Sequence, residues 1–197
     1  NEPLMLSRVF GLGRRSFDSL SEQEILALAI SSEEDDARIY RAYADGLRNE
    51  FPQSAKIFEE MADEEDGHRA ALIDMHRKRF GERIPLIRRE HVRGYYERKP
   101  DWLVRPLGVE NVRRMAEEME RQAQRYYAEA AKRTSDAATR KLLGDLAAAE
   151  QSHEDLAHKL GLKHTPGEVR EEEHQTERRQ FILTYIQPGL AGLMDGS

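Results

Sequence analysis

The sequence predicts an all-α protein, a four-helix bundle of two helix pairs joined by a long crossover and followed by a C-terminal helix. The first observation is composition: 35% of the 197 residues are charged, and Glu, Lys, Arg and Ala are abundant while Val, Ile and Thr are scarce. This composition favours long amphipathic helices over sheets. The second observation is that the helical segments form two pairs, each with a short internal turn. The third is that the helix pair occurs only twice, which argues against a solenoid, because a solenoid needs at least about three repeats.

The first helix pair begins with a clear start signal. Ser21 and Glu24 form the capping-box pattern Ser-x-x-Glu, and an apolar face follows directly after them. This pattern predicts a helix over about 22–49. A second helix is predicted over about 54–79, where Gly81 stops it.

The second pair follows a long connection. The segment 82–108 contains three prolines and is expected to cross from one pair to the next. A third helix is predicted over about 110–133. Ser135-Asp136 supplies the N-cap of a fourth helix, which is expected to end at Gly161.

These elements predict three regions. Residues 1–20 are expected to be a loosely docked leader, because Gly11 and Gly13 interrupt any regular pattern. Residues 21–161 are expected to form the bundle. Residues 162–197 are expected to form a C-terminal helix and linker, whose apolar stretch is shorter than the roughly 20 residues that span a bilayer.

Charge and cysteine content exclude several classes of function. The net charge is −6 with both signs interspersed, so a nucleic acid is not the expected partner. The chain has no cysteine, which excludes disulfides, thiol redox chemistry and cysteine-ligated metal sites within it. The N-terminal residues lack the pattern of a secretory signal, which favours a cytosolic location.

The two halves of the chain share a pattern of metal-ligand residue types. Each half carries a Glu-x-x-Ala-x-x-Tyr motif followed about thirty residues later by Glu-x-x-His. The residues are Glu34 to Tyr40 with Glu65 and His68 in the first half, and Glu120 to Tyr126 with Glu150 and His153 in the second. A third Glu-x-x-His lies in the charged tail. The Glu-x-x-His motif alone is therefore weak evidence. The prediction of a metal site rests on the nearly equal spacing of the two motifs in both halves.

This pattern suits a dinuclear metal site inside the bundle. A Glu and a His three positions apart lie on adjacent turns of a helix and can bind one ion together. Two ferrous ions carry four positive charges, which carboxylates gathered in the core can balance. Carboxylate oxygens with an imidazole nitrogen suit iron or manganese, and such a site leaves positions open for dioxygen or peroxide.

The predicted metal ligands are Glu34, Glu65, His68, Glu117, Glu120, Glu150 and His153. On the first helix Glu33 competes with Glu34, and the match of Ala37 with Ala123 favours Glu34. Tyrosines on the faces of the site are expected to pack in the core with a hydroxyl bonded to a carboxylate.

The third helix offers three neighbouring carboxylates. Glu120 aligns with Glu34 in the repeat. Glu117 lies one turn earlier on about the same face and is expected to be a seventh ligand, able to move in or out, whereas Glu118 points elsewhere.

In these residues the sequence resembles the rubrerythrin-type, ferritin-like di-iron proteins over about residues 22–160. The resemblance lies in the order Glu, Glu-x-x-His, Glu-x-x-Glu and Glu-x-x-His along four helices. Rubrerythrins usually carry a rubredoxin domain with four cysteines, and this chain has none. The resemblance therefore implies a di-iron cofactor without a built-in electron donor.

The C-terminal run from Pro188 to Ser197 resembles the start of the first membrane helix of vacuolar-iron-transporter-like proteins. A ferritin-like domain followed by such a transporter is the architecture of the membrane-bound ferritins. This resemblance implies oxidation of Fe(II) with oxygen or peroxide, in the service of iron sensing or of delivery to a membrane iron exporter. It implies a location at the cytoplasmic face of the inner membrane and a homodimer.

Two other functions use the same residues. One is a rubrerythrin-like peroxidase or a manganese catalase that draws on a separate reductant. The other is a metal-regulated dimerisation module, in which the long crossover lets helix pairs exchange between subunits.

Overall fold

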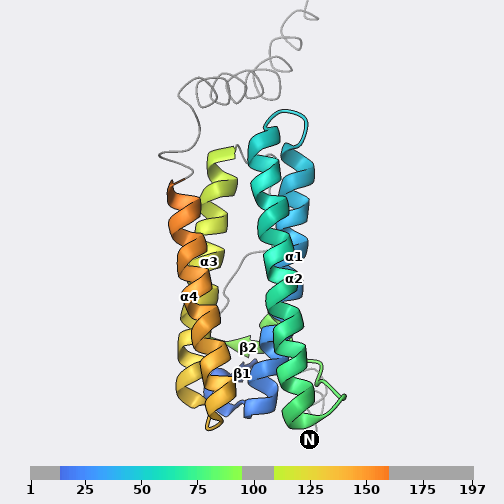
Figure 1. The fold of residues 1–197 in the computed structure, drawn as a ribbon, viewed down its shortest axis with the longest axis vertical. Coiled ribbons are helices and arrows are strands. Elements are labelled where there is room, and N and C mark those ends of the chain that lie inside the picture. Colours follow the sequence, from blue (N-terminus) through green and yellow to red (C-terminus); the bar gives the residue numbers. More distant parts are fainter. Residues whose placement is uncertain (1–13, 95–108, 160–197) are drawn as a thin grey trace, which may run out of the picture.

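The computed structural model describes residues 14–94 and 109–159, with side chains as far as Ser152. Four long helices run side by side (Figure 1). Helix α1 (Glu22–Leu47) pairs with α2 (Pro52–Phe80), and α3 (Val109–Arg133) pairs with α4 (Ala137–Lys159). Contacts within each pair are extensive, and those between the pairs are sparser. The predicted all-α bundle of two helix pairs is confirmed.

The ends of the first pair form for local reasons. Ser21 accepts a hydrogen bond from the Glu24 amide at 3.2 Å, and the Glu24 carboxylate accepts one from the Ser21 amide at 2.9 Å. This completes the predicted capping box and satisfies amides that the first turn leaves unbonded. Pro52 opens α2, and Gly81 closes it with φ of 82°, a conformation that favours glycine.

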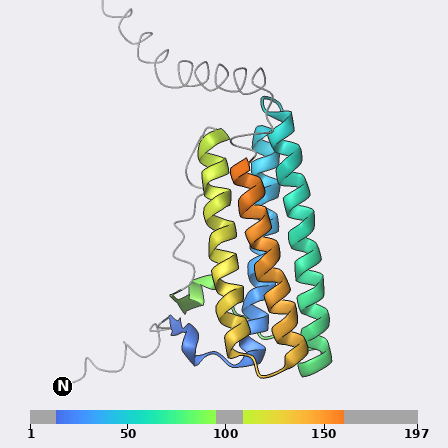
Figure 2. The ribbon, with the colours of Figure 1, turned by 60° about the vertical axis from the view of Figure 1, so that its left-hand side comes forward.

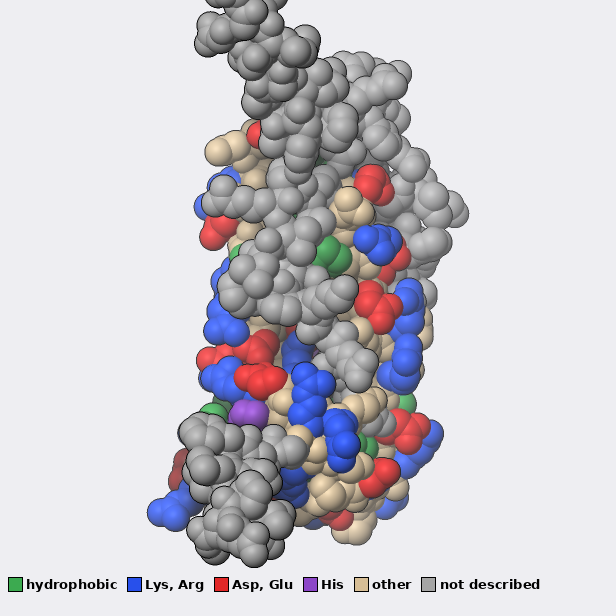
Figure 3. All heavy atoms as spheres, turned by 180° about the vertical axis from the view of Figure 1, so that it is seen from behind, with side chains coloured by type: hydrophobic (Ala, Val, Ile, Leu, Met, Phe, Trp, Pro, Cys, Tyr) green, Lys and Arg blue, Asp and Glu red, His purple; other side chains and the backbone are tan. Residues whose placement is uncertain are grey.

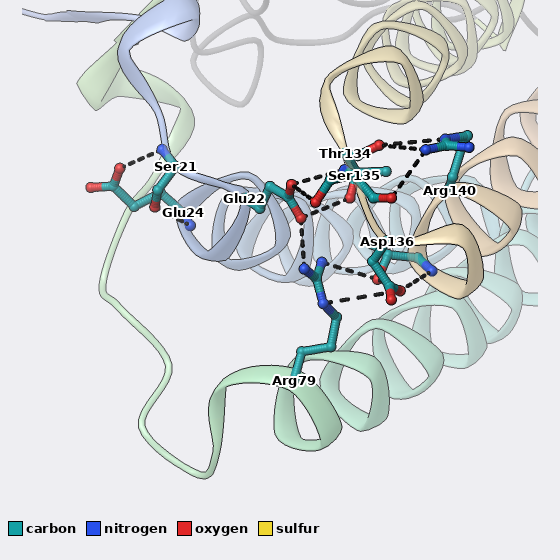
Figure 4. A network of polar contacts seen from close by, with 9 residues as sticks. Ser21, Glu22, Glu24, Arg79, Thr134, Ser135, Asp136 and Arg140 are labelled. Atoms are coloured by element: carbon teal, nitrogen blue, oxygen red, sulfur yellow. Dashed lines mark hydrogen bonds and ion pairs between the residues drawn. The ribbon is translucent and has the colours of Figure 1, made fainter.

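A polar network closes the end of the bundle where α1 and α4 begin (Figure 4). Glu22 accepts hydrogen bonds from the Ser135 amide and hydroxyl at 2.8 and 2.7 Å, and it pairs with Arg79 at 2.7 Å. Asp136 accepts a bond from the Thr139 amide at 2.8 Å, which makes it the predicted cap of α4. The network therefore joins α1, α2 and the turn between α3 and α4.

Among the residues that the structure describes, the apolar core forms two clusters, which polar residues separate along α1. One cluster includes Ile25 to Ile30 of α1, and the other includes Tyr40, Ala44 and Leu47. Between them α1 buries Ser32, Glu33 and Asp36. Burying polar groups between two apolar clusters costs free energy unless they are paired or bound, so this level of the bundle is where a site is expected.

The segment before α1 and the start of the crossover are attached to the bundle. Strand β1 (Arg15–Ser16) pairs in parallel with strand β2 (Val92–Arg93), and Phe17 is 5% exposed in the core. The described part of the leader, from residue 14, therefore pairs with the start of the crossover and packs Phe17 into the core (Figure 2).

The remaining predictions about the ends of the chain concern residues that the structure does not describe. They are the leader before residue 14, the later part of the crossover, the end of the fourth helix and the C-terminal helix. Among residues 14–94 and 109–159, no helix combines the length and the apolar character that crossing a bilayer requires. The face seen in Figure 3 shows Lys and Arg side chains interspersed with Asp and Glu, as on solvated helix faces.

Candidate metal centre

Four side chains from three helices converge between the two apolar clusters. Glu33 lies on α1, Glu65 and His68 on α2, and Glu150 on α4. Each offers one ligand atom, and these atoms all lie within 4.8 Å of one another. The carboxylates of Glu33, Glu65 and Glu150 belong to residues at most 3% exposed, so they are shielded from bulk solvent.

The remaining helix, α3, contributes a fourth buried carboxylate, and two tyrosines donate hydrogen bonds to members of the set. Glu120 of α3 is 1% exposed and interacts with Glu150. The Tyr40 hydroxyl on α1 donates to Glu120, and the Tyr127 hydroxyl on α3 donates to Glu33. Helices α1 and α3 therefore each supply a tyrosine that orients a carboxylate on the other helix. The predicted tyrosine hydroxyl bonded to a carboxylate is confirmed.

His68 lies between carboxylates of two helices. Its Nδ1 atom is 3.2 Å from Glu65 Oε2, 3.2 Å from Glu150 Oε1 and 3.8 Å from Glu33 Oε2. Burial alone would lower the pKa of His68, but the hydrogen bonds and charges of Glu150 and Glu65 outweigh it and raise the pKa to about 10. The metal-free centre therefore holds a proton on an imidazole that is ligand-competent only when neutral.

The carboxylates themselves repel one another. Burial, and then the charge of Glu65, raise the pKa of Glu33 well above its usual value. Burial is also the main reason why the pKa of Glu150 is raised, although the hydrogen bond with His68 opposes it. In the described part of the chain, the Oε2 atoms of Glu33 and Glu150 are buried without a hydrogen-bond partner.

These observations fit a metal ion. Unsatisfied carboxylate oxygens, mutual repulsion and one nearby imidazole are what a divalent cation with oxygen and nitrogen ligands would resolve. The residues that could hold the ions are Glu33, Glu65, His68, Glu120 and Glu150. This donor set has hard oxygen atoms and no sulfur, which suits iron and manganese.

The structure differs from the prediction on the first helix. The Glu34 side chain is 54% exposed and lies 3.5 Å from Arg69, whereas Glu33 is 3% exposed and lies in the cluster. One residue along a helix turns a side chain by about 100°, so the two neighbours point in different directions, and Glu33 is the one that faces the cluster. Glu33 replaces Glu34 as the candidate ligand.

A signal for Glu33 was present in the sequence. Glu33 and Tyr40 are seven residues apart, and so are Glu120 and Tyr127. Seven residues make about two helical turns and return to the same face. The second half has two adjacent tyrosines, Tyr126 and Tyr127, so Tyr40 can be aligned with either. Alignment with Tyr127 pairs Glu33 with Glu120. Alignment with Tyr126, which also matches the alanines, pairs Glu34 with Glu120.

The structure places the other predicted ligands as follows. Glu65, His68 and Glu150 lie together in the cluster, with Glu120 beside them. Glu117 is half-buried on α3, one turn before Glu120 and outside the four-residue cluster. His153 belongs to α4, but its side chain lies outside the described part of the chain. Metal binding by these residues stays a prediction.

Buried Glu residues from all four helices, with a histidine three positions after one of them, define the class of ferritin-like carboxylate proteins that hold two metal ions. The family model of rubrerythrin matches residues 24–161. The chain belongs to the rubrerythrin family, and membership implies binding of a di-iron centre.

Two solved structures share the fold. An uncharacterised conserved protein from Magnetospirillum magnetotacticum is 25% identical, with a TM-score of 0.61, over 75% of this chain and 97% of its own. A hypothetical protein from Pyrococcus furiosus is 22% identical, with a TM-score of 0.60, over 72% of this chain and 89% of its own. No curated protein matches the sequence.

Proposed function

We propose that the chain binds two ferrous ions in the carboxylate cluster and oxidises them with oxygen or peroxide. The observation that carries the proposal is the convergence of the buried residues Glu33, Glu65 and Glu150, with buried Glu120 interacting with Glu150. With hydrogen peroxide as the oxidant, two ferrous ions give up two electrons, the O–O bond breaks and two protons complete two water molecules. Bound iron would supply the electron transfer, which no side chain here provides.

The residues of the chain have separate tasks in this reaction. The four carboxylates would balance the charge of two divalent ions, and His68 would bind once it has lost its proton. Tyr40 and Tyr127 fix the rotamers of Glu120 and Glu33 by hydrogen bonds. Burial and the charge of Glu120 raise the pKa of Tyr40 well above its usual value, so that its hydroxyl remains a donor.

The cellular role that we propose is iron sensing or delivery to a membrane iron exporter. The support is the resemblance of residues 188–197 to the start of a vacuolar-iron-transporter-like membrane helix. The chain would then be the ferritin-like part of a membrane-bound ferritin, acting as a homodimer at the cytoplasmic face of the inner membrane.

The test is an anaerobic titration of the purified protein with Fe(II), followed by oxygen or peroxide and monitored by near-ultraviolet absorbance. Saturation near two ions per chain, followed by rapid ferric absorbance, is expected. Glu65→Ala and Glu150→Ala should abolish this binding, and Glu34→Ala should leave it intact as the exposed control. Retained stoichiometric binding in both cluster variants would refute the site.

Membership in the rubrerythrin family favours a peroxidase as the second candidate function. The two functions differ in what limits the reaction. Sustained peroxide consumption with an added reductant and a constant amount of iron would identify a peroxidase. Consumption that stops after two ferrous ions per chain, and resumes when more Fe(II) is added, would identify an iron oxidase.

A further inference from the structure

A buried ion pair adjoins the metal centre. Asp36 follows Glu33 by one turn on the buried face of α1 and is 5% exposed. Arg89, from the crossover, places its Nη2 atom 2.6 Å from Asp36 Oδ2, and the two side chains are only 9% and 6% exposed. Arg89 also donates to the Ser32 carbonyl of α1. A segment distant in sequence thus brings a permanent positive charge beside the cluster.

The neighbouring acidic residues are held differently. Asp35 is 14% exposed and lies 3.6 Å from Arg88, which is itself 38% exposed. Solvent screens such a pair, so it contributes little to the field inside the bundle. Asp36 alone combines burial, the face of Glu33 and a buried cationic partner. The charges of Asp36 and Arg89 both act on Glu33, the first raising and the second lowering its pKa.

We propose that Arg89 withholds Asp36 from the metal centre, and that the pair thereby fixes the charge of the centre at four carboxylates, which balances two divalent ions and disfavours trivalent ones. Arg89 is in this sense a positioning residue that sets which ion charge the centre retains. The inference rests on the proposed function, because it assumes that the cluster binds metal. For an iron oxidase, weaker retention of the trivalent product would favour its release.

The charges of the ions determine the ratio of the two expected changes in affinity as well as their direction. Removing Arg89 leaves the charge of Asp36 unbalanced and adds one negative charge near the ions. The interaction energy with that charge is proportional to the charge of the ion. The gain in binding free energy for a trivalent ion should therefore be about 3/2 of that for a divalent ion. If the divalent ion binds about tenfold more tightly, the trivalent ion should bind roughly thirtyfold more tightly.

The experiment measures equilibrium binding of Mn(II) by electron paramagnetic resonance and of Tb(III) by luminescence, which Tyr40 and Tyr127 beside the cluster can sensitise. Arg89→Met should bind both ions more tightly in the ratio above, and Arg89→Lys should stay near wild type. Asp36→Asn leaves Arg89 unbalanced and should weaken both. The double variant Asp36→Asn with Arg89→Met has neither charge and should return close to wild type.

The matched control is Arg88→Met, which removes the adjacent, solvated arginine and should change binding less than about twofold. A purely structural role for the buried pair predicts weaker binding in Arg89→Met and no recovery in the double variant, and either result overturns the inference. If the wild-type protein binds the ions but these variants do not differ, the inference alone fails. If the wild-type protein binds neither ion, the proposed function fails with it.

Discussion

Replacing Glu33 by Gln should stabilise the metal-free protein while weakening metal binding. Glu33 is buried, and burial together with Glu65 holds its pKa well above the usual 4.5. Between pH 4.5 and the folded-state pKa, the unfolded chain loses the proton that the folded protein keeps. The free energy of unfolding therefore falls as pH rises, by about 1.4 kcal/mol per pH unit for this group.

At pH 7 this contribution is a cost to the folded protein that is absent at pH 4.5. Gln carries no such cost, has the same shape and still accepts the hydrogen bond from Tyr127 through its amide oxygen. We expect urea denaturation in the presence of a chelator to show Glu33→Gln similar to wild type at pH 4.5 and more stable than wild type at pH 7, by about 1.4 kcal/mol for each pH unit over which the folded protein keeps the Glu33 proton.

The matched control is Glu34→Gln, because Glu34 is 54% exposed. Its effect on stability should stay within about 0.5 kcal/mol at either pH. A gain in Glu33→Gln that is independent of pH, or a pH-dependent gain in Glu34→Gln, would refute the assignment of Glu33 to the centre. So would a Glu33→Gln protein that binds divalent ions as tightly as wild type.

Three further variants test the surrounding structure. Tyr127→Phe removes the donor to buried Glu33 and should lower the free energy of unfolding by about 1–3 kcal/mol in urea titrations, where no change would show that the bond is not formed. Glu22→Gln should cost about 2 kcal/mol at pH 7, because hydrogen bonds from Ser135 lower the pKa of Glu22 to about 2. That contribution is complete above pH 4.5 and is lost as pH falls towards 2, so the two proteins should converge in acid denaturation curves. Ser21→Ala breaks the capping box of α1 and should cost about 1 kcal/mol by thermal denaturation, whereas an unchanged midpoint would show that the cap is not needed.

The fold was predictable from the sequence because its signals are local. The Ser21 cap, the glycine after α2 and the Asp136 cap each act within one helical turn, so the predicted helix bounds lie within two residues of those observed wherever the structure describes both. The repeat also predicted that Glu65, His68, Glu120 and Glu150 face one interior.

The details of the centre were less accessible, because they depend on rotation and on distant contacts. A one-residue error in aligning the halves selects Glu34 in place of Glu33, and these two side chains point about 100° apart around the helix. The partner of Asp36 lies 53 positions further along the chain, in a crossover without regular periodicity, as the positions of Asp36 and Arg89 show. No local sequence pattern predicts such an ion pair, because Arg89 reaches Asp36 only when the crossover has folded against α1.

The position of the centre implies that the proposed metal binding would be linked to folding in this bundle. Each helix pair is well packed within itself, and the contacts between the pairs are sparser. The cluster draws Glu33 and Glu65 from one pair and Glu120 and Glu150 from the other. Without metal, mutual repulsion of these buried acids weakens the junction between the pairs. Bound metal would instead connect the two pairs through the same acids, because a ligand that binds only the folded state stabilises it more, the more tightly it binds. The residues that lower the stability of the metal-free protein are therefore the ones through which ions would hold the two halves together.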